Sequence, residues 1–177
     1  MPSKEPLEKA YPNLNDFLPF LDELNRESPR GMVLMAAGFL EEQLRKILLA
    51  FMMDEEPARQ LVEGYSAPLG TFSARIGSCF ALGLVSPDEH HDLTVIRRIR
   101  NDFAHRIVVS FDDPSIRDRC ATLRSKAHDY ARVRDKEVFS VTPAGQFSTG
   151  AIGLILNLVN RPHYVELERR SHKRWPY

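Results

Sequence analysis

The chain has 177 residues and a mass of 20.3 kDa, which fits one domain of ordinary size. It carries 24 Lys and Arg residues against 24 Asp and Glu residues, so its formal net charge is zero with histidine neutral. This balance argues against attraction of the whole surface to nucleic acid or anionic membrane, although it leaves room for a local basic patch. With 43% apolar and 27% charged residues, the composition excludes a disordered chain and a membrane-embedded one.

The first residues of the chain and its two cysteines indicate the cellular compartment in which the protein is expected. Residues 1–15 mix charge, proline and asparagine without an apolar run, so no signal peptide is visible. We therefore expect Cys79 and Cys120 to be free, buried thiols in a reducing, cytoplasmic environment. The apolar run from Ala151 to Val159 has about half the length of a bilayer span, and we expect no membrane contact.

Apolar residues recur with helical spacing along most of the chain. The first such segment runs from Leu14 to Leu24 and contains Pro19. Because proline fits only the first turn of a helix, we expect this helix to begin near Leu18.

A wide apolar stripe predicts a long helix from about Arg30 to Met53, with its methionines filling the core. On its polar side, Glu41 with Arg45 and Glu42 with Lys46 are spaced four residues apart. We expect each of these two pairs to form an ion pair worth about 0.2–0.5 kcal/mol.

Two shorter helices follow. One is expected from Pro57 to Glu63, with Gly64 as a left-handed stop. The turn at residues 67–73 then leads into a helix that ends at Gly83, whose apolar side chains share one face: Phe72, Ile76, Cys79 and Phe80.

The start of the next helix is the clearest boundary in the sequence. Ser86 can cap the helix, Pro87 suits its first position and Glu89 completes a capping box. This helix is expected to reach about His105, with Leu93, Ile96, Ile99 and Phe103 on its buried face.

The last third of the chain is less regular. An extended link over 106–111 is followed by a helix expected from residue 112 to about Arg132, an irregular stretch over 134–146, and a final helical segment that Pro162 kinks or ends. We expect flexible tails at 1–12 and 165–177. The predicted fold is a single all-α domain, a bundle of six or seven helices.

The segment from Ile96 to Arg106 holds four arginines and one aspartate, a local charge of about +3 in a neutral protein. Arg100 lies at the edge of the apolar face, and Asn101 and His105 follow toward the polar side. Arg100 and His105 are about 140° apart around an unbroken helix. They can meet at one ligand only if the helix ends at or just before His105.

If they meet, the pair suits phosphate chemistry. The guanidinium of Arg100 offers a fork of donors to phosphate oxygens, and the imidazole of His105 exchanges a proton near neutral pH. Such a pair is adequate for metal-free attack of an RNA 2′-hydroxyl on its own phosphodiester. The alternative is structural: Arg100, Asn101 and His105 bond to helix ends and acidic neighbours, and so close the bundle or a dimer.

Three stretches carry a resemblance to a known family. Residues 67–76 (APLGTFSARI), 81–85 (ALGLV) and 96–105 resemble the mannitol operon repressors (MltR-like proteins) over about 40 residues. The resemblance implies an all-helical, dimeric regulator of transcription that lacks a recognised DNA-reading module. The sequence agrees, since no basic recognition helix or zinc-finger spacing stands out. Such a regulator acts through protein contacts, for example with a transcription factor.

The string from Arg100 to His105 is also similar to the motif of HEPN-type ribonucleases, which cleave RNA without metal. By that resemblance, Arg100 would hold the scissile phosphate, Asn101 would orient it and His105 would handle the proton. Two protomers of that superfamily bring their motifs together at a dimer groove. This similarity implies an endoribonuclease that acts as a toxin or antiviral effector, with RNA as its partner.

The leading hypothesis is the MltR-like regulator, a homodimer that works through the end of the helix over residues 86–105; the nuclease is the alternative. A third interpretation is a plain interaction module. Neither function requires a cofactor or a metal.

A patch for phosphate or RNA would consist of Arg97, Arg98, Arg106 and Arg75. A second basic cluster lies near the C-terminus beside Trp175, where a solvated tail is the favoured interpretation: Arg161, Arg169, Arg170, Lys173 and Arg174.

Overall fold

The computed structural model describes residues 14–125 and 142–176. Within these two ranges the chain is helical with turns and loops and has no strand, which confirms the all-α fold class. No helix in the same ranges is both long enough and apolar enough to cross a lipid bilayer.

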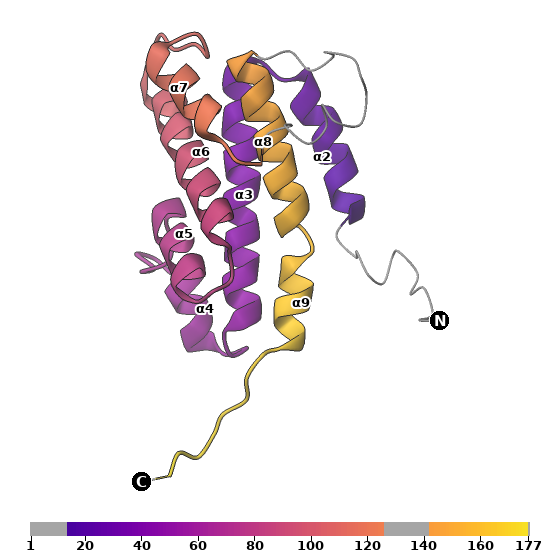
Figure 1. The fold of residues 1–177 in the computed structure, drawn as a ribbon. Helices are drawn as coiled ribbons and strands as arrows, with labels where there is room; N and C mark the ends of the chain where they lie inside the picture. The colour runs from indigo at the N-terminus through magenta and orange to yellow at the C-terminus, as the bar shows by residue number, and fades with distance from the viewer. Residues whose placement is uncertain (1–13, 126–141, 177) are drawn as a thin grey trace, which may run out of the picture.

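Helix α3 (Pro29–Phe51) is the central element of the bundle. Figure 1 shows it running the length of the molecule, with α2, α5, α6, α8 and α9 arranged around it. The side chain of Ser28 caps its first turn by accepting the N–H of Gly31 at 3.1 Å. The middle of its predicted apolar stripe is buried, and so is the polar Gln43. Met32 and Met35 are only half-buried at the edge of the core, so the prediction that the methionines fill it is wrong.

Helix α2 (Leu14–Arg26) begins before Pro19, so the expected start near Leu18 is wrong. A proline inside a helix removes one backbone hydrogen bond. The burial of Phe17 and Leu24 in the common core offsets the loss of this hydrogen bond. Phe20 adds a ring contact with Phe39 of α3, with 4.3 Å between the ring centroids.

Helices α4 (Glu56–Glu63) and α5 (Phe72–Ala81) form the expected short pair. Gly64 follows α4 with a φ of −66°, so it is not the left-handed stop that we predicted. A Cβ atom at Gly64 would lie 2.8 Å from the carbonyl oxygen of Gln60. This close approach of the backbone, and not a positive φ, explains why a glycine stands at position 64. Gly83 does have a positive φ, +72°, after the end of α5.

Phe80 does not share the buried face of α5, contrary to the prediction. Its ring is 42% exposed and stacks on His90, with centroids 4.2 Å apart. Phe72, Ile76 and Cys79 are buried as predicted.

Helix α6 (Pro87–His105) has the predicted bounds, and its capping box is present. Helix α7 (Pro114–Thr122) is shorter than the expected helix to Arg132. The buried carboxylate of Asp92 accepts the N–H groups of Arg124 and Ser125 at 2.9 and 2.8 Å, which draws the chain out of helical geometry. The rest of the expected helix lies outside the described residues beyond Ser125.

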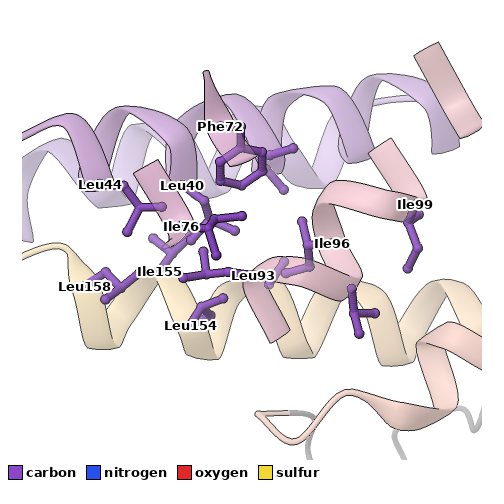
Figure 2. Packing of buried hydrophobic residues seen from close by; sticks show 14 of the residues in the cluster. Leu40, Leu44, Phe72, Ile76, Leu93, Ile96, Ile99, Leu154, Ile155 and Leu158 are labelled. Atoms are coloured by element: carbon purple, nitrogen blue, oxygen red, sulfur yellow. The ribbon is translucent and has the colours of Figure 1, made fainter. Parts of the chain in front are cut away.

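Helix α8 (Pro143–Leu158) begins within the stretch that we expected to be irregular, with Thr142 as its N-cap. Pro162 stands in the first turn of α9 (Arg161–Leu167), where a proline is tolerated. Helix α9 packs against α3 near the end of the chain. Figure 2 shows the core, where side chains from α3, α5, α6 and α8 converge: Leu40, Leu44, Phe72, Ile76, Leu93, Ile96, Leu154 and Ile155.

Candidate functional site

The candidate site is the outward surface at the end of α6 and in the link that follows. We call it the α6-end surface and define it by Arg97, Arg98, Asn101, His105, Ile107 and Val108. Helix α6 carries this surface, and a capping box fixes the start of the helix. The hydroxyl of Ser86 accepts the N–H of Glu89 at 3.2 Å, and the carboxylate of Glu89 accepts the N–H of Ser86 at 2.8 Å. The buried face of α6 anchors it against α3 and α5.

Arg30 of α3 holds the end of α6. Its guanidinium donates to the carbonyl oxygens of Phe103 at 2.6 Å, Arg106 at 2.9 Å and Ile107 at 3.0 Å. A cation on the last carbonyls of a helix satisfies orphan acceptors and opposes the helix dipole. This role could not be predicted from the sequence, because nothing in the spacing links two segments more than 70 residues apart. Helix α6 therefore ends at His105 in a fixed geometry.

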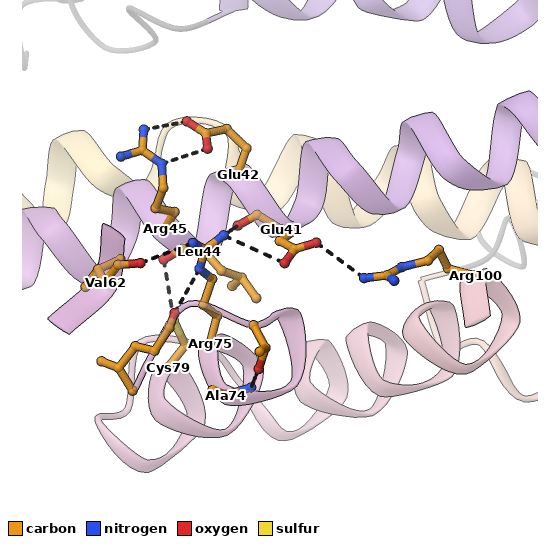
Figure 3. A network of polar contacts seen from close by, with 11 residues as sticks. Glu41, Glu42, Leu44, Arg45, Val62, Ala74, Arg75, Cys79 and Arg100 are labelled. Atoms are coloured by element: carbon orange, nitrogen blue, oxygen red, sulfur yellow. Dashed lines mark hydrogen bonds and ion pairs between the residues drawn. The ribbon is translucent and has the colours of Figure 1, made fainter. Parts of the chain in front are cut away.

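Arg100 points into the bundle. One guanidinium nitrogen lies 3.4 Å from a carboxylate oxygen of Glu41 (Figure 3). The guanidinium carbon lies 5.8 Å from the centroid of the Phe72 ring. Glu41 also faces Arg75, at 3.8 Å. The predicted Glu41–Arg45 pair is wrong for this reason: Glu41 turns to arginines of α5 and α6, and Arg45 binds other carboxylates.

Arg45 and Glu42 pair three residues apart, in place of the expected Glu42–Lys46 pair. The hydrogen bonds from Arg45 hold the pKa of Glu42 below its usual value, despite the opposing effect of burial. Glu63 at the end of α4 is a second partner of Arg45. The contact with Glu63 ties α3 to α4, and Figure 3 shows the Arg45–Glu42 part of this cluster.

Arg75 lies inside the molecule and outside the α6-end surface. Its side chain is 11% exposed and donates to the carbonyl oxygens of Leu69 at 3.0 Å, Val62 at 3.3 Å and Glu41 at 3.4 Å. The guanidinium thus links α3, α4 and α5. Arg75 and Arg100 both belong to the stretches that carry the family resemblance, and both converge on Glu41 (Figure 3).

His105 is exposed at the last position of α6, and Asn101 is half-buried one turn earlier. Because α6 is helical through His105, Arg100 and His105 remain about 140° apart around its axis. Within the described ranges, no hydrogen bond or ion pair joins Arg100 to His105 or Asn101. The structure therefore places the three motif residues on one helix, with Arg100 turned inward and His105 turned outward.

The remaining arginines of the predicted patch differ in their ion pairs and in their exposure to solvent. Arg106 pairs with Asp113 at 2.9 Å. Arg98 is exposed and Arg97 is half-buried, and in the described part of the chain neither forms an ion pair. The positive charge of the α6-end surface comes from these two residues. In the link after α6, Ile107 is 95% exposed and Val108 is 83% exposed.

Ligands for a metal ion do not gather in the parts of the chain that the structure describes: no three His, Cys, Asp or Glu side chains there are arranged to hold one. Both cysteines are free and buried, as predicted. Burial raises the pKa of Cys79 to about 12, so its thiol is protonated at neutral pH. The chemistry available at the α6-end surface is that of an exposed imidazole, an amide, two guanidiniums and two aliphatic side chains.

No protein-family model matches the sequence, and no curated protein matches it. Among solved structures, the X-ray structure of the MtlR–HPr complex from Escherichia coli contains a chain that superposes on this one with a TM-score of 0.60 at 20% sequence identity. The match covers 81% of this chain and 95% of the other. The chain has an MtlR-like fold, as the resemblance to mannitol operon repressors implied.

Proposed function

We propose that this chain is a regulator of the MltR-like kind that acts through protein contacts, with the α6-end surface as its binding surface. The observation that carries the proposal is the likeness to MtlR, a protein whose structure was solved in complex with the protein HPr. The proposed activity is binding of a small protein partner, either an HPr-like protein or a transcription factor.

The chemistry of the α6-end surface supports a protein partner. Ile107 and Val108 project almost completely into solvent, and burying such side chains drives protein association. Arg97 and Arg98 lie about two turns before the end of α6, so the partner is expected to offer an apolar pocket to the link and acidic residues to this part of α6. The bonds from Arg30 hold this link in place before binding, which lowers the entropy cost of association.

Calorimetric titration tests the proposal, with purified HPr of E. coli as the probe. We expect saturable binding, and we expect a Val108→Asp variant to weaken it at least tenfold because an aspartate cannot enter an apolar pocket. A double Arg97→Glu, Arg98→Glu variant should weaken it as well, and more at low salt. Arg59→Glu on α4 is the matched control, since Arg59 is an exposed arginine beyond the end of α3 that lies opposite Arg30, and it should leave affinity unchanged.

The regulatory part of the proposal needs a cellular readout. Inducible expression of the wild-type chain should change a small set of transcripts, measured by RNA sequencing, and the Val108→Asp variant should not. The proposal fails if HPr does not bind and the two transcript profiles are the same.

We also propose that the chain is a homodimer. Light scattering after size-exclusion chromatography measures the molecular mass directly, and a monomeric mass would contradict the proposal.

A second candidate function, metal-free RNA cleavage, is favoured by one observation: α6 ends at His105, which is exposed near Asn101 and two arginines. It requires Arg100 to leave Glu41. Incubation of RNA with the protein and a chelator tests it, and Glu41→Gln should raise cleavage by releasing Arg100. Intact RNA, or cleavage that persists in a His105→Ala variant, rejects the nuclease.

A further inference from the structure

The C-terminal tail, residues 168–176, lies over a groove at the corner where α3 ends and α4 begins. Figure 1 shows the tail leaving α9 at this end of the bundle. Arg169 anchors it by donating to the carbonyl oxygens of Ala50 at 3.0 Å and Leu49 at 3.4 Å. The imidazole of His172 lies 2.8 Å from a carboxylate oxygen of Glu55. Two contacts, to α3 and to the α3–α4 link, therefore hold the tail across the groove.

The groove has a volume of about 580 Å³, which lies in the range of small-molecule sites. Its lining is mostly apolar, and Trp175 contributes from the tail. Trp175 is nonetheless 77% exposed and Leu61 is 45% exposed. The tail thus forms one side of the groove and leaves its apolar surface accessible. The apolar side chains of α3, α4 and their link that line it are Phe51, Met52, Met53, Pro57, Ala58 and Leu61.

The charges at the rim of the groove have one predominant sign. Arg170 and Lys173 both line it, and in the described residues neither forms an ion pair. The carboxylate of Glu55 is already engaged by His172. An apolar floor with two uncompensated cations at its edge suits a ligand with an apolar body and an anionic head.

We propose that this groove binds a single-chain amphipathic anion of the fatty-carboxylate type. The hydrocarbon chain lies along the methionines and Leu61 under Trp175, and the carboxylate meets Arg170 and Lys173. The site is separate from the proposed protein-binding surface, because α3 carries Arg30 at its start and the groove at its end, about 30 Å apart.

Fluorescence provides the test, because Trp175 is the only tryptophan in the sequence. Titration of the full chain with decanoate, kept below its micelle concentration, should give a saturable blue shift as the indole leaves water. In the series from octanoate to dodecanoate, affinity should rise about two- to fourfold per methylene because each added group is buried. Calorimetry should give the same affinities.

Variants separate the site from non-specific adsorption. The double variant Arg170→Glu, Lys173→Glu should weaken decanoate binding at least tenfold. Arg174→Glu is the matched control, since Arg174 is in the same tail and does not line the groove; it should change affinity less than twofold. Leu61→Asp, at an exposed position, should also weaken binding.

Three results would each overturn the proposal. The first is the absence of saturable binding up to the solubility limit of dodecanoate, which would leave the groove as a packing surface for the tail. The second is equal affinity for decyltrimethylammonium, which would show that the rim charges play no part. The third is unchanged binding in the Leu61→Asp variant, which would place the ligand elsewhere.

Discussion

Arginines bind main-chain carbonyl oxygens at several junctions of this bundle. In the described part of the chain, Arg30, Arg75, Arg161 and Arg169 each donate to at least two carbonyl groups of other segments or helix ends. Carbonyls at helix ends lack partners within their helix, and a guanidinium with five donors can satisfy several at once. Much of the positive charge in this neutral sequence therefore joins helices and is not available to a ligand.

The most buried of these arginines gives a prediction about stability. Arg75→Leu should lower the free energy of unfolding by about 2–4 kcal/mol, because three carbonyl groups lose a partner and Glu41 loses a cation. Urea denaturation followed by circular dichroism measures the change. Arg98→Ala, at an exposed arginine, is the control and should stay within about 0.5 kcal/mol of wild type. A loss as small as the control's would show that Arg75 is not a structural link.

Glu89 gives a prediction about pH. Burial raises its pKa, but hydrogen bonds from Arg161 and Ser86 outweigh burial and leave the pKa below its usual value. A group with a lowered folded-state pKa stabilises the fold fully above its unfolded pKa, about 4.3 for glutamate. That contribution is lost as the pH falls through the lower folded-state pKa.

The unfolding free energies of wild type and Glu89→Gln should therefore differ most above about pH 5 and converge as the solution is made more acidic. Urea titrations between pH 3 and pH 7 provide the measurement. A difference for Glu89→Gln that grows toward low pH would contradict the assignment.

At the scale of helices, Arg30 connects the start of α3 to the end of α6. Arg30→Ala should destabilise the protein by about 1–2 kcal/mol and loosen the link after α6. The amide of Arg106, which donates to the carbonyl of Asp102 at 3.0 Å, reports on this end of the helix. Its hydrogen exchange should speed up roughly tenfold, while amides in the middle of α3 should change only as global stability does. Unchanged exchange at Arg106 would mean that Asp113 suffices to hold the link.

Helix boundaries that local signals set could be predicted from the sequence, and boundaries that tertiary contacts set could not. The signals at Ser86, Pro87 and Glu89 are local, and the start of α6 is where they placed it. The end of α7 depends on Asp92, a residue of another helix, whose buried carboxylate binds the backbone after Leu123. The early start of α2 depends on burial of Phe17 in the shared core. The contact of Asp92 leaves no pattern in the sequence near α7. The helical spacing from Leu14 to Leu24 did include Phe17, but the rule that proline fits only the first turn outweighed it.

The candidate site follows the same rule. Spacing correctly placed Arg100 at the edge of the apolar face of α6 and ended the helix at His105. It also paired Glu41 with Arg45, because residues four apart on a helix are neighbours. In the folded chain Glu41 faces Arg75 and Arg100, which come from two other helices, so the direction of the Arg100 side chain could not be derived before the packing of α3, α5 and α6 was known.

For the molecule as a whole, the two cysteines give a test of compactness. Cys79 and Cys120 are both buried, and burial raises the pKa of Cys79 to about 12. At pH 8 only about one Cys79 thiol in ten thousand is ionised in the folded state. Reaction with an aromatic disulfide reagent should therefore be at least about a thousandfold slower in buffer than in 8 M urea. In buffer, both cysteines should react together, when the whole protein unfolds. Rapid release of one equivalent from the native protein would indicate a local opening.

The central position of α3 has a consequence for how the protein is made. Its apolar stripe is complete once residue 51 has been synthesised, but the helices that cover it include α8 and α9, whose residues are translated more than 90 positions later. On the ribosome this stripe therefore stays partly uncovered until the last helices have been synthesised. We expect the nascent α3 segment to be the place where a chaperone engages the growing polypeptide.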